Sequence, residues 1–249
     1  MKIETRLLTH LTVLAAFLLL WEWLARSGAV SGFYTGAPSA IFSALLEHFR
    51  SGLFARHGAR SLGNLAIGYP LALVCGALAG VVIGYYKPLY RNLRFYLQAF
   101  YTVPQLVLIP FFILWLGVEN ASKITIIFLM AFFPVLISAM EAAKAVDPEL
   151  VNVCRVYGAG RLMTLSRLVL PACAPQIAAG AKIGAVRAVA GLILGEAFGR
   201  AEGLGYLLFH FGAVYSVNDM MAVLVVIMAA GLSLFFSLNF AERKILTWK

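Results

Sequence analysis

Charged residues are scarce in this sequence. Only 12% of the 249 residues are charged, whereas 62% are apolar and the mean hydropathy is +0.88. An ordinary soluble domain carries about twice that share of charged residues. The scarcity therefore excludes an ordinary soluble protein and predicts an integral membrane protein.

Disulfide and catalytic motifs are also lacking. The three cysteines are odd in number and widely spaced, so no disulfide framework is expected. The sequence contains no Gly-Lys dipeptide, which excludes a Walker A phosphate loop in this chain, and no His-Glu-x-x-His or Cys/His metal-binding spacing. We therefore expect no bound cofactor, no metal and no catalytic centre.

No linker or low-complexity stretch divides the chain, so residues 1–249 are expected to form a single transmembrane domain. The amino terminus resembles a secretory signal, because Lys2 and Arg6 precede an apolar run. However, Glu22 and Trp23 stand where small residues would be needed for cleavage, so this run is interpreted as a membrane helix.

Six apolar stretches are each about long enough to cross a bilayer, which needs about 20 residues per helix. They are Leu7–Leu24, Leu65–Tyr85, Phe95–Leu116, Ile124–Met140, Pro175–Phe198 and Met220–Phe240. Pro104 and Pro110 interrupt the third stretch and Pro134 the fourth, and such prolines predict kinks that face protein or a pore. The sequence predicts an all-α fold with six transmembrane helices.

The basic residues between these stretches are unevenly distributed. If the termini lie inside, twelve Lys and Arg lie inside, six lie outside, and Lys182 and Arg187 fall within the fifth stretch. The positive-inside rule then predicts cytoplasmic termini. The same residues form no contiguous basic face, so nucleic acid is not an expected partner despite the net charge of +9.

The first outer loop contains an apolar stripe of helical period after Pro38, interrupted by Ser43, Glu47 and His48. It predicts a helix that either lies flat at the membrane surface or packs on the outer ends of the spans.

Small residues recur every four positions in the second stretch. Residues at this spacing form one face of a helix, and small side chains let another membrane helix approach closely. The stripe predicts a packing face, within the chain or between two copies, with gating as the alternative: Gly68, Ala72, Gly76, Gly80 and Gly84.

The longest polar interruption runs from Glu141 to Pro171. Asp147 can cap a helix that begins at Pro148, Glu149 suits the positive helix start, and Gly158 can end the helix in a left-handed conformation. A second short helix is expected from Arg161 to Leu170. Two short helices that project from a membrane protein predict docking to a soluble partner, and the alternative is a pair of interfacial helices without a partner.

This segment resembles the cytoplasmic loop of binding-protein-dependent ABC importer permeases, whose signature is Glu-Ala-Ala, three residues, Gly, nine residues, Ile-x-Leu-Pro. Gly158 is followed after nine residues by Leu168, Val169, Leu170 and Pro171. Asn152-Val153-Cys154 replaces the usual tripeptide. PQLVLIPFFILWLG, Ser122-Lys123, FFPV and GEAFGRAEGLGYLL extend the resemblance from about residue 38 to the carboxyl terminus, and they are similar to the nitrate, sulfonate and taurine branch.

The resemblance implies a type I importer fold, a second copy of this chain, two cytoplasmic ATPase subunits that bind ATP and Mg, a periplasmic or lipid-anchored solute-binding protein, and a bacterial inner membrane. It implies import of a small solute such as nitrate, a sulfonate or taurine, with ATP hydrolysed elsewhere. It also implies an ATPase-coupling site: Asp147, Pro148, Glu149, Asn152, Gly158, Ala159, Arg161, Leu170 and Pro171.

Polar groups within the apolar stretches are candidates for a translocation pathway, because polar groups in a membrane usually face a partner or water. Tyr101, Pro104 and Gln105 accompany the interruption of the third stretch, and Glu196 lies near the end of the fifth. Core packing is the alternative for Tyr101 and Gln105. The alternative function is a secondary transporter or membrane enzyme without ATPases, although neither inverted repeats nor a catalytic cluster is detected.

Overall fold

The computed structural model describes residues 2–27 and 36–245, and within these ranges it contains helices, turns and bends but no strand. The helical elements are α1 (Lys2–Arg26), α3 (Pro38–Arg50), α4 (Leu53–Tyr85), α5 (Lys87–Thr102), η1 (Gln105–Leu108), α6 (Ile109–Leu116), α7 (Asn120–Lys144), α8 (Pro148–Val156), α9 (Arg161–Thr164), η2 (Leu165–Val169), α10 (Leu170–Phe198), α11 (Leu204–Ala213) and α12 (Val217–Ile245). The all-α prediction is confirmed.

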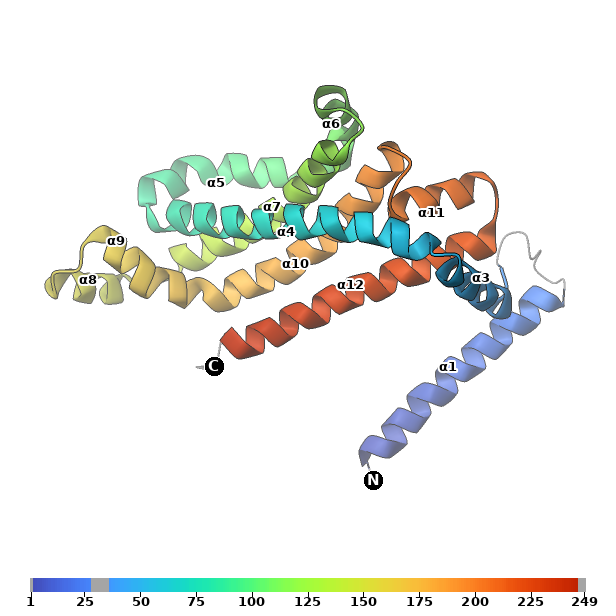
Figure 1. Cartoon of the computed structure of the whole chain (residues 1–249). Helices are drawn as coiled ribbons and strands as arrows, with labels where there is room; N and C mark the ends of the chain where they lie inside the picture. Colours follow the sequence, from blue (N-terminus) through green and yellow to red (C-terminus); the bar gives the residue numbers. More distant parts are fainter. Residues whose placement is uncertain (1, 28–35, 246–249) are drawn as a thin grey trace.

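The long helices lie lengthwise in one bundle. Figure 1 shows α8 and α9 at one end of this bundle, α3 and α11 at the other, and α1 diverging from it. Among the described residues, four helical segments are long and apolar enough to cross a membrane: Leu53–Tyr85, Asn120–Lys144, Arg161–Phe198 and Val217–Lys244. They contain the predicted second, fourth, fifth and sixth spans, and the predicted first span falls within α1.

The predicted third span is not one kinked helix. Lys87–Thr102 and Gln105–Leu116 are bent by 80° at a short break, and only together do they pass the test for a span. Pro104 stands in this break, where its ring and missing N–H prevent a continuous helix. By contrast, α7 continues through Pro134 from Asn120 to Lys144.

The centre of the bundle is α7, which packs against α4 on one side and α10 on the other. The small-residue stripe of α4 lies against α7 of the same chain: a Cβ added at Gly68 would lie 2.8 Å from Cγ2 of Ile127, and one at Gly76 would lie 2.9 Å from the carbonyl oxygen of Phe132. The glycines therefore allow the two backbones to approach closely.

A second glycine face, which the sequence pattern did not single out, lies on α10. A Cβ at Gly180 would lie 2.6 Å from Cβ of Ser138, and one at Gly191 would lie 3.0 Å from the Met130 sulfur. Because α7 contacts small residues on both sides, the three helices form one tightly packed layer.

The amphipathic helix after Pro38 packs on the ends of the long helices rather than standing alone. Its buried Ile41 and Ala44 share a cluster with Phe54 of α4 and Leu204 and Leu207 of α11. The short apolar helix α11 was not predicted, because its residues were expected to form a connection between spans.

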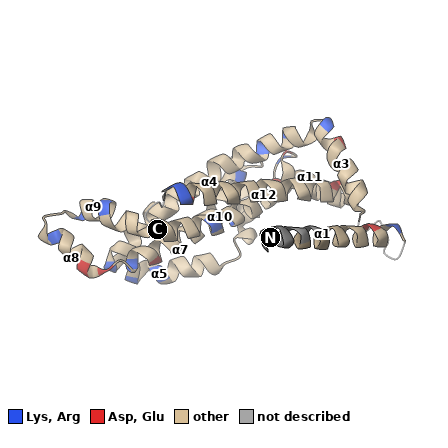
Figure 2. Ribbon diagram, turned by 90° about the horizontal axis from the view of Figure 1, so that it is seen from below, with Lys and Arg blue, Asp and Glu red and all other residues tan. Residues whose placement is uncertain are grey.

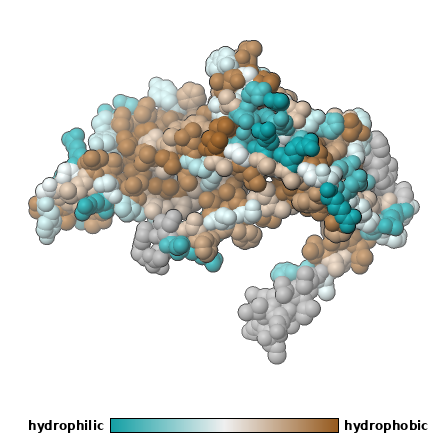
Figure 3. All heavy atoms as spheres, viewed as in Figure 1, coloured by the Kyte–Doolittle hydropathy of each residue, from teal (hydrophilic) through white to brown (hydrophobic). Residues whose placement is uncertain are grey.

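Large apolar side chains remain exposed along the bundle, among them Leu114 (78%), Trp115 (74%) and Phe236 (64%). Figure 3 shows extensive apolar surface over the long helices and hydrophilic patches toward both ends. An apolar surface of this extent is suited to contact with lipid or with other membrane helices rather than with water.

Candidate functional site

Helix α8 begins with a complete amino-terminal cap. Oδ1 of Asp147 accepts a hydrogen bond of 2.8 Å from the N–H of Glu149, and Pro148 occupies the first turn, where its missing N–H costs nothing. None of the residues of α8 is buried. The helix is thus well defined by its own sequence and leaves its surface, including Asn152, open to a partner.

The end of α8 is built around Gly158. The N–H of Ala159 donates to the carbonyl of Cys154, and the N–H of Gly158 donates to that of Arg155, both at 2.9 Å. This pair of bonds is a Schellman motif, and Gly158 has the left-handed φ of +80° that the motif requires. A Cβ at this position would meet nothing within 4 Å, so only the backbone conformation selects glycine.

The expected second short helix from Arg161 to Leu170 is wrong as an independent element. Helix α9 runs without a break into the π turn η2 and then into α10, so that Arg161–Phe198 is one long helical segment. The N–H of Leu170 donates to the carbonyl of Leu165, the five-residue spacing of a π turn. Pro171 follows in the first turn of α10 and does not start a separate span.

The bend between α5 and η1 holds three of the residues expected on the pathway. Pro104 is exposed, while Tyr101 and Gln105 are half-buried. Nε2 of Gln105 is buried and makes no hydrogen bond within residues 2–27 and 36–245. The bend thus combines exposed apolar side chains with one amide nitrogen that makes no hydrogen bond within the described residues.

Glu196 lies elsewhere, in a buried polar cluster at the α11 end. Both of its carboxylate oxygens lie 2.8 Å from the donating hydroxyl of Ser61, and Oε2 also accepts a 2.9 Å bond from the N–H of Gly205. The Ser61 hydroxyl in turn accepts a 2.8 Å bond from the N–H of Leu204. Glu196 is wholly buried, so within one chain it joins α10 to α4 and to the start of α11.

Lys123 is a second buried charged residue at this end of the bundle. Its ammonium group donates to the carbonyls of Arg200 at 3.4 Å and Glu202 at 3.5 Å, and the residue is only 1% exposed. In the sequence, Lys123 stands out only as part of the Ser122-Lys123 resemblance. Nothing in the spacing of residues 61 and 196 indicated that they meet, because they belong to two different helices.

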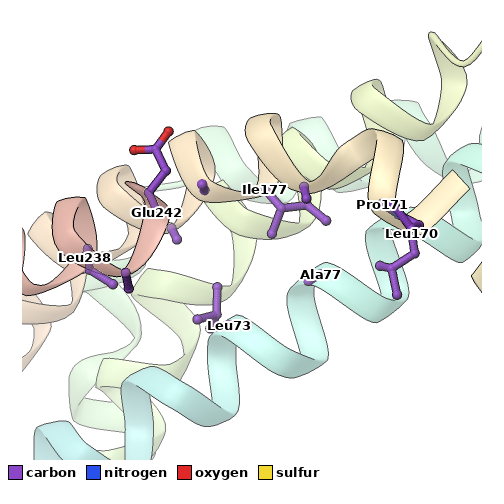
Figure 4. Close-up of a pocket in the computed structure, with 11 residues that line it drawn as sticks. Leu73, Ala77, Leu170, Pro171, Ile177, Leu238 and Glu242 are labelled. Atoms are coloured by element: carbon purple, nitrogen blue, oxygen red, sulfur yellow. The ribbon is translucent and has the colours of Figure 1, made fainter. Parts of the chain in front are cut away.

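The two basic residues inside the fifth span have different surroundings. Lys182 forms an ion pair with Glu242 of α12, whereas Arg187 is exposed. Beside this ion pair, an apolar groove of about 450 Å³ lies between α4, α10 and α12. Figure 4 shows Leu73, Ile177 and Leu238 around the groove and the Glu242 carboxylate turned away from α4.

No group of three or more His, Cys, Asp or Glu side chains that could hold a metal ion occurs in the described part of the chain. The arrangement consists of apolar helices, an exposed capped helix at one end, and a bent segment beside the bundle. These features are typical of a helical integral membrane protein.

Comparison with known proteins identifies the family. The model of the family described as "binding-protein-dependent transport system inner membrane component" matches residues 72–246. SsuC of Bacillus subtilis, named for the transport of aliphatic sulfonates, is 31% identical over 94% of this chain and 85% of its own length. TauC of Escherichia coli, a taurine transport system permease, is 25% identical over 94% of this chain and 87% of its own. The chain belongs to the permease family of binding-protein-dependent ABC transporters.

A solved structure also resembles the fold. One chain of the MetNI methionine ABC transporter, in an inward-facing conformation, matches with a TM-score of 0.66 at 21% identity, over 78% of this chain and 96% of that chain. This likeness concerns the fold alone and does not identify the transported solute. The chain is therefore a transport subunit of the inner membrane and not itself an enzyme.

Proposed function

We propose that two copies of this chain form the pathway of a type I ABC importer, with α8 of each copy docked to a cytoplasmic ATPase. The observation that carries the proposal is α8 itself, capped at Asp147, closed at Gly158 and without a buried residue. A helix whose two ends are fixed by its own sequence, yet which buries none of its residues, is suited to bind another protein. ATP and Mg would be bound by the ATPase subunits.

The connection from α8 to the spans supports a mechanical link. The segment from Arg161 to Phe198 is helical throughout, so a displacement at its α9 end is transmitted along α10 into the bundle. Val169 and Cys173 of this segment are buried against Val81 of α4 and Ala139 of α7. ATP-driven closure of the two ATPases would thus alternate access of the pathway between the two sides.

The solute is proposed to be a small sulfonate, with taurine as one candidate. This assignment rests on the relatives named for aliphatic sulfonates and taurine. Tyr101, Pro104 and Gln105 are proposed to line the pathway where the third span bends, because the buried amide nitrogen of Gln105 makes no hydrogen bond within the described residues. For Glu196 the buried contacts favour a structural task, and its place on the pathway stays a prediction.

A solute-binding protein is proposed to dock at the opposite end, over α3 and α11. Reconstitution tests the whole assignment: the permease, an ATPase and a binding protein encoded beside it should together import a sulfonate when ATP is supplied inside vesicles. The purified complex should contain two permeases and two ATPases by light-scattering mass. A complex with one permease, or uptake that proceeds without the ATPase, would contradict the proposal.

Cytoplasmic termini are proposed from the distribution of basic residues. Lys87, Lys144, Arg155 and Arg161 gather at the α8 end, as Figure 2 shows around α5, α8 and α9, and this end is proposed to be cytoplasmic. Lys249, one of the twelve basic residues expected on the inner side, lies outside the described residues.

Single cysteines test this orientation. A cysteine in place of Arg91 or Arg161 should react with a membrane-impermeant maleimide only after the cytoplasmic side is opened, and one in place of Asn120 or Glu202 should react from outside in intact cells. Cys75, Cys154 and Cys173 are first replaced by serine as the background control. The opposite labelling pattern would reverse the proposed topology.

A further inference from the structure

Four basic side chains line one cavity at the α8 end of the molecule. Lys87 begins α5 and Lys144 ends α7. Arg155 lies in the last turn of α8, and Arg161 begins α9. The cavity has a volume of about 500 Å³, which falls within the range of roughly 300–1,000 Å³ for small-ligand sites. Residues distant in sequence thus converge on a space large enough for a ligand.

The positive charge of this cavity is unbalanced within the described residues. In the part of the chain that the structure describes, no Asp or Glu lines the cavity, and none of the four basic side chains forms an ion pair. The nearby Glu141 is already engaged, by Arg94 at 3.3 Å and by the Tyr90 hydroxyl at 3.0 Å. Like charges held together repel one another, and a bound anion would remove that cost.

The position of the cavity indicates the depth at which a ligand would bind. Tyr85 and Tyr86, at the end of α4, also line it, and tyrosines at helix ends are typical of the headgroup level of a bilayer. The first turn of α5 starts at the same corner without an acidic residue and without a side-chain cap. Its free N–H groups add partial positive charge there.

We propose that this cavity binds the phosphate group of an anionic ligand. Two sources share that chemistry, an anionic phospholipid headgroup at the inner membrane surface and a soluble phosphate, and pockets of this kind between membrane helices are suited to lipid headgroups. Because α8 has no buried residue, a phosphate between Arg155 and Lys87 would tie α8 to the corner of α4 and α5. The binding site itself does not depend on the proposed ATPase docking.

The test measures ligand binding to the purified full-length permease. Short-chain phosphatidylglycerol, short-chain phosphatidylcholine and inorganic phosphate are titrated separately and followed by native mass spectrometry. The test variant is Lys87→Gln with Lys144→Gln, which leaves the exposed face of α8 unchanged. The matched control is Arg91→Gln with Arg167→Gln, which removes the same charge from exposed residues that do not line the cavity.

We expect wild type and control to bind phosphatidylglycerol more tightly than phosphatidylcholine, and the test variant to bind phosphatidylglycerol about tenfold more weakly. Equal binding of the two lipids, with inorganic phosphate bound and lost in the test variant, would support the site and identify a soluble phosphate as its ligand. Equal affinity of test variant and control for every ligand would overturn the proposal.

Discussion

Replacing Gly158 by valine is expected to reduce solute uptake at least about tenfold while the permease remains in the membrane at normal abundance. Gly158 has a φ of +80°, and a side-chain-bearing residue in that region is disfavoured by about 1–2 kcal/mol. A free energy of about 1.4 kcal/mol corresponds to a tenfold change in an equilibrium. A β-branched residue therefore shifts the turn away from the conformation that ends α8.

The effect should be local, because the position has no neighbours to disturb. A Cβ at Gly158 meets nothing within 4 Å, so valine creates no clash with the spans and acts only through the backbone. Loss of the two hydrogen bonds that Gly158 and Ala159 donate to α8 would misplace the surface proposed to bind the ATPase. Co-purification of the ATPase and uptake in vesicles are the two measurements.

Gly160 supplies the matched control. It lies two residues further on and has an ordinary φ of −68°, and a Cβ added there would likewise meet nothing within 4 Å. Gly160→Val should therefore retain uptake and ATPase association. If Gly158→Val also transports at the wild-type rate, at equal abundance, then α8 and its closing turn do not couple ATP hydrolysis to transport.

Replacing Gly80 by valine is expected to destabilise the bundle markedly. A Cβ at Gly80 would lie 2.7 Å from the Cβ of Ala139 and would also overlap the carbonyl oxygen of Leu136. The second obstacle is backbone, which cannot rotate aside as a flexible side chain can. Overpacking of a tight interior typically costs about 1–3 kcal/mol, and occasionally more, so abundance and thermal stability in detergent should both fall.

Gly63 is the control on the same helix. It is exposed, and a Cβ there meets nothing within 4 Å. Gly63→Val makes the same chemical change in α4 without touching α7, and it should leave the abundance and the melting temperature unchanged. If the two variants are equally stable and monodisperse, the close approach of α4 and α7 at Gly80 is not required by the fold.

Local rules accounted for the features that depend on neighbouring residues in the chain. Asp147, Pro148 and Gly158 specify the two ends of α8 because caps act within one helical turn. The four-residue spacing of the glycines in α4 specifies a packing face, because residues at this spacing lie on one side of a helix. What such rules could not specify was the partner of that face, since α7 and a second copy of the chain would satisfy the pattern equally.

The errors arose where a helix continues or breaks against the local signal. Pro171 suggested a boundary, yet the chain remains helical from Arg161 to Phe198 through a π turn whose Val169 is buried against α4 and α7. The kink expected at Pro104 is present, but its angle of 80° separates the third span into two helical pieces. Tertiary packing overrides the local tendency to end the helix near Pro171. At Pro104, the ring and the missing N–H break the helix.

The sequence by itself determined that this protein lies in lipid, that it is helical, where α8 begins and ends, and that it has no phosphate loop. These features follow from composition and short-range spacing, which are properties of the chain alone. Tertiary structure alone decided that Glu196 meets Ser61 and the start of α11, and that Lys87 and Lys144 share a cavity with Arg155. These groups are brought together by the crossing of separate helices, and no periodicity along one helix records where another will cross it.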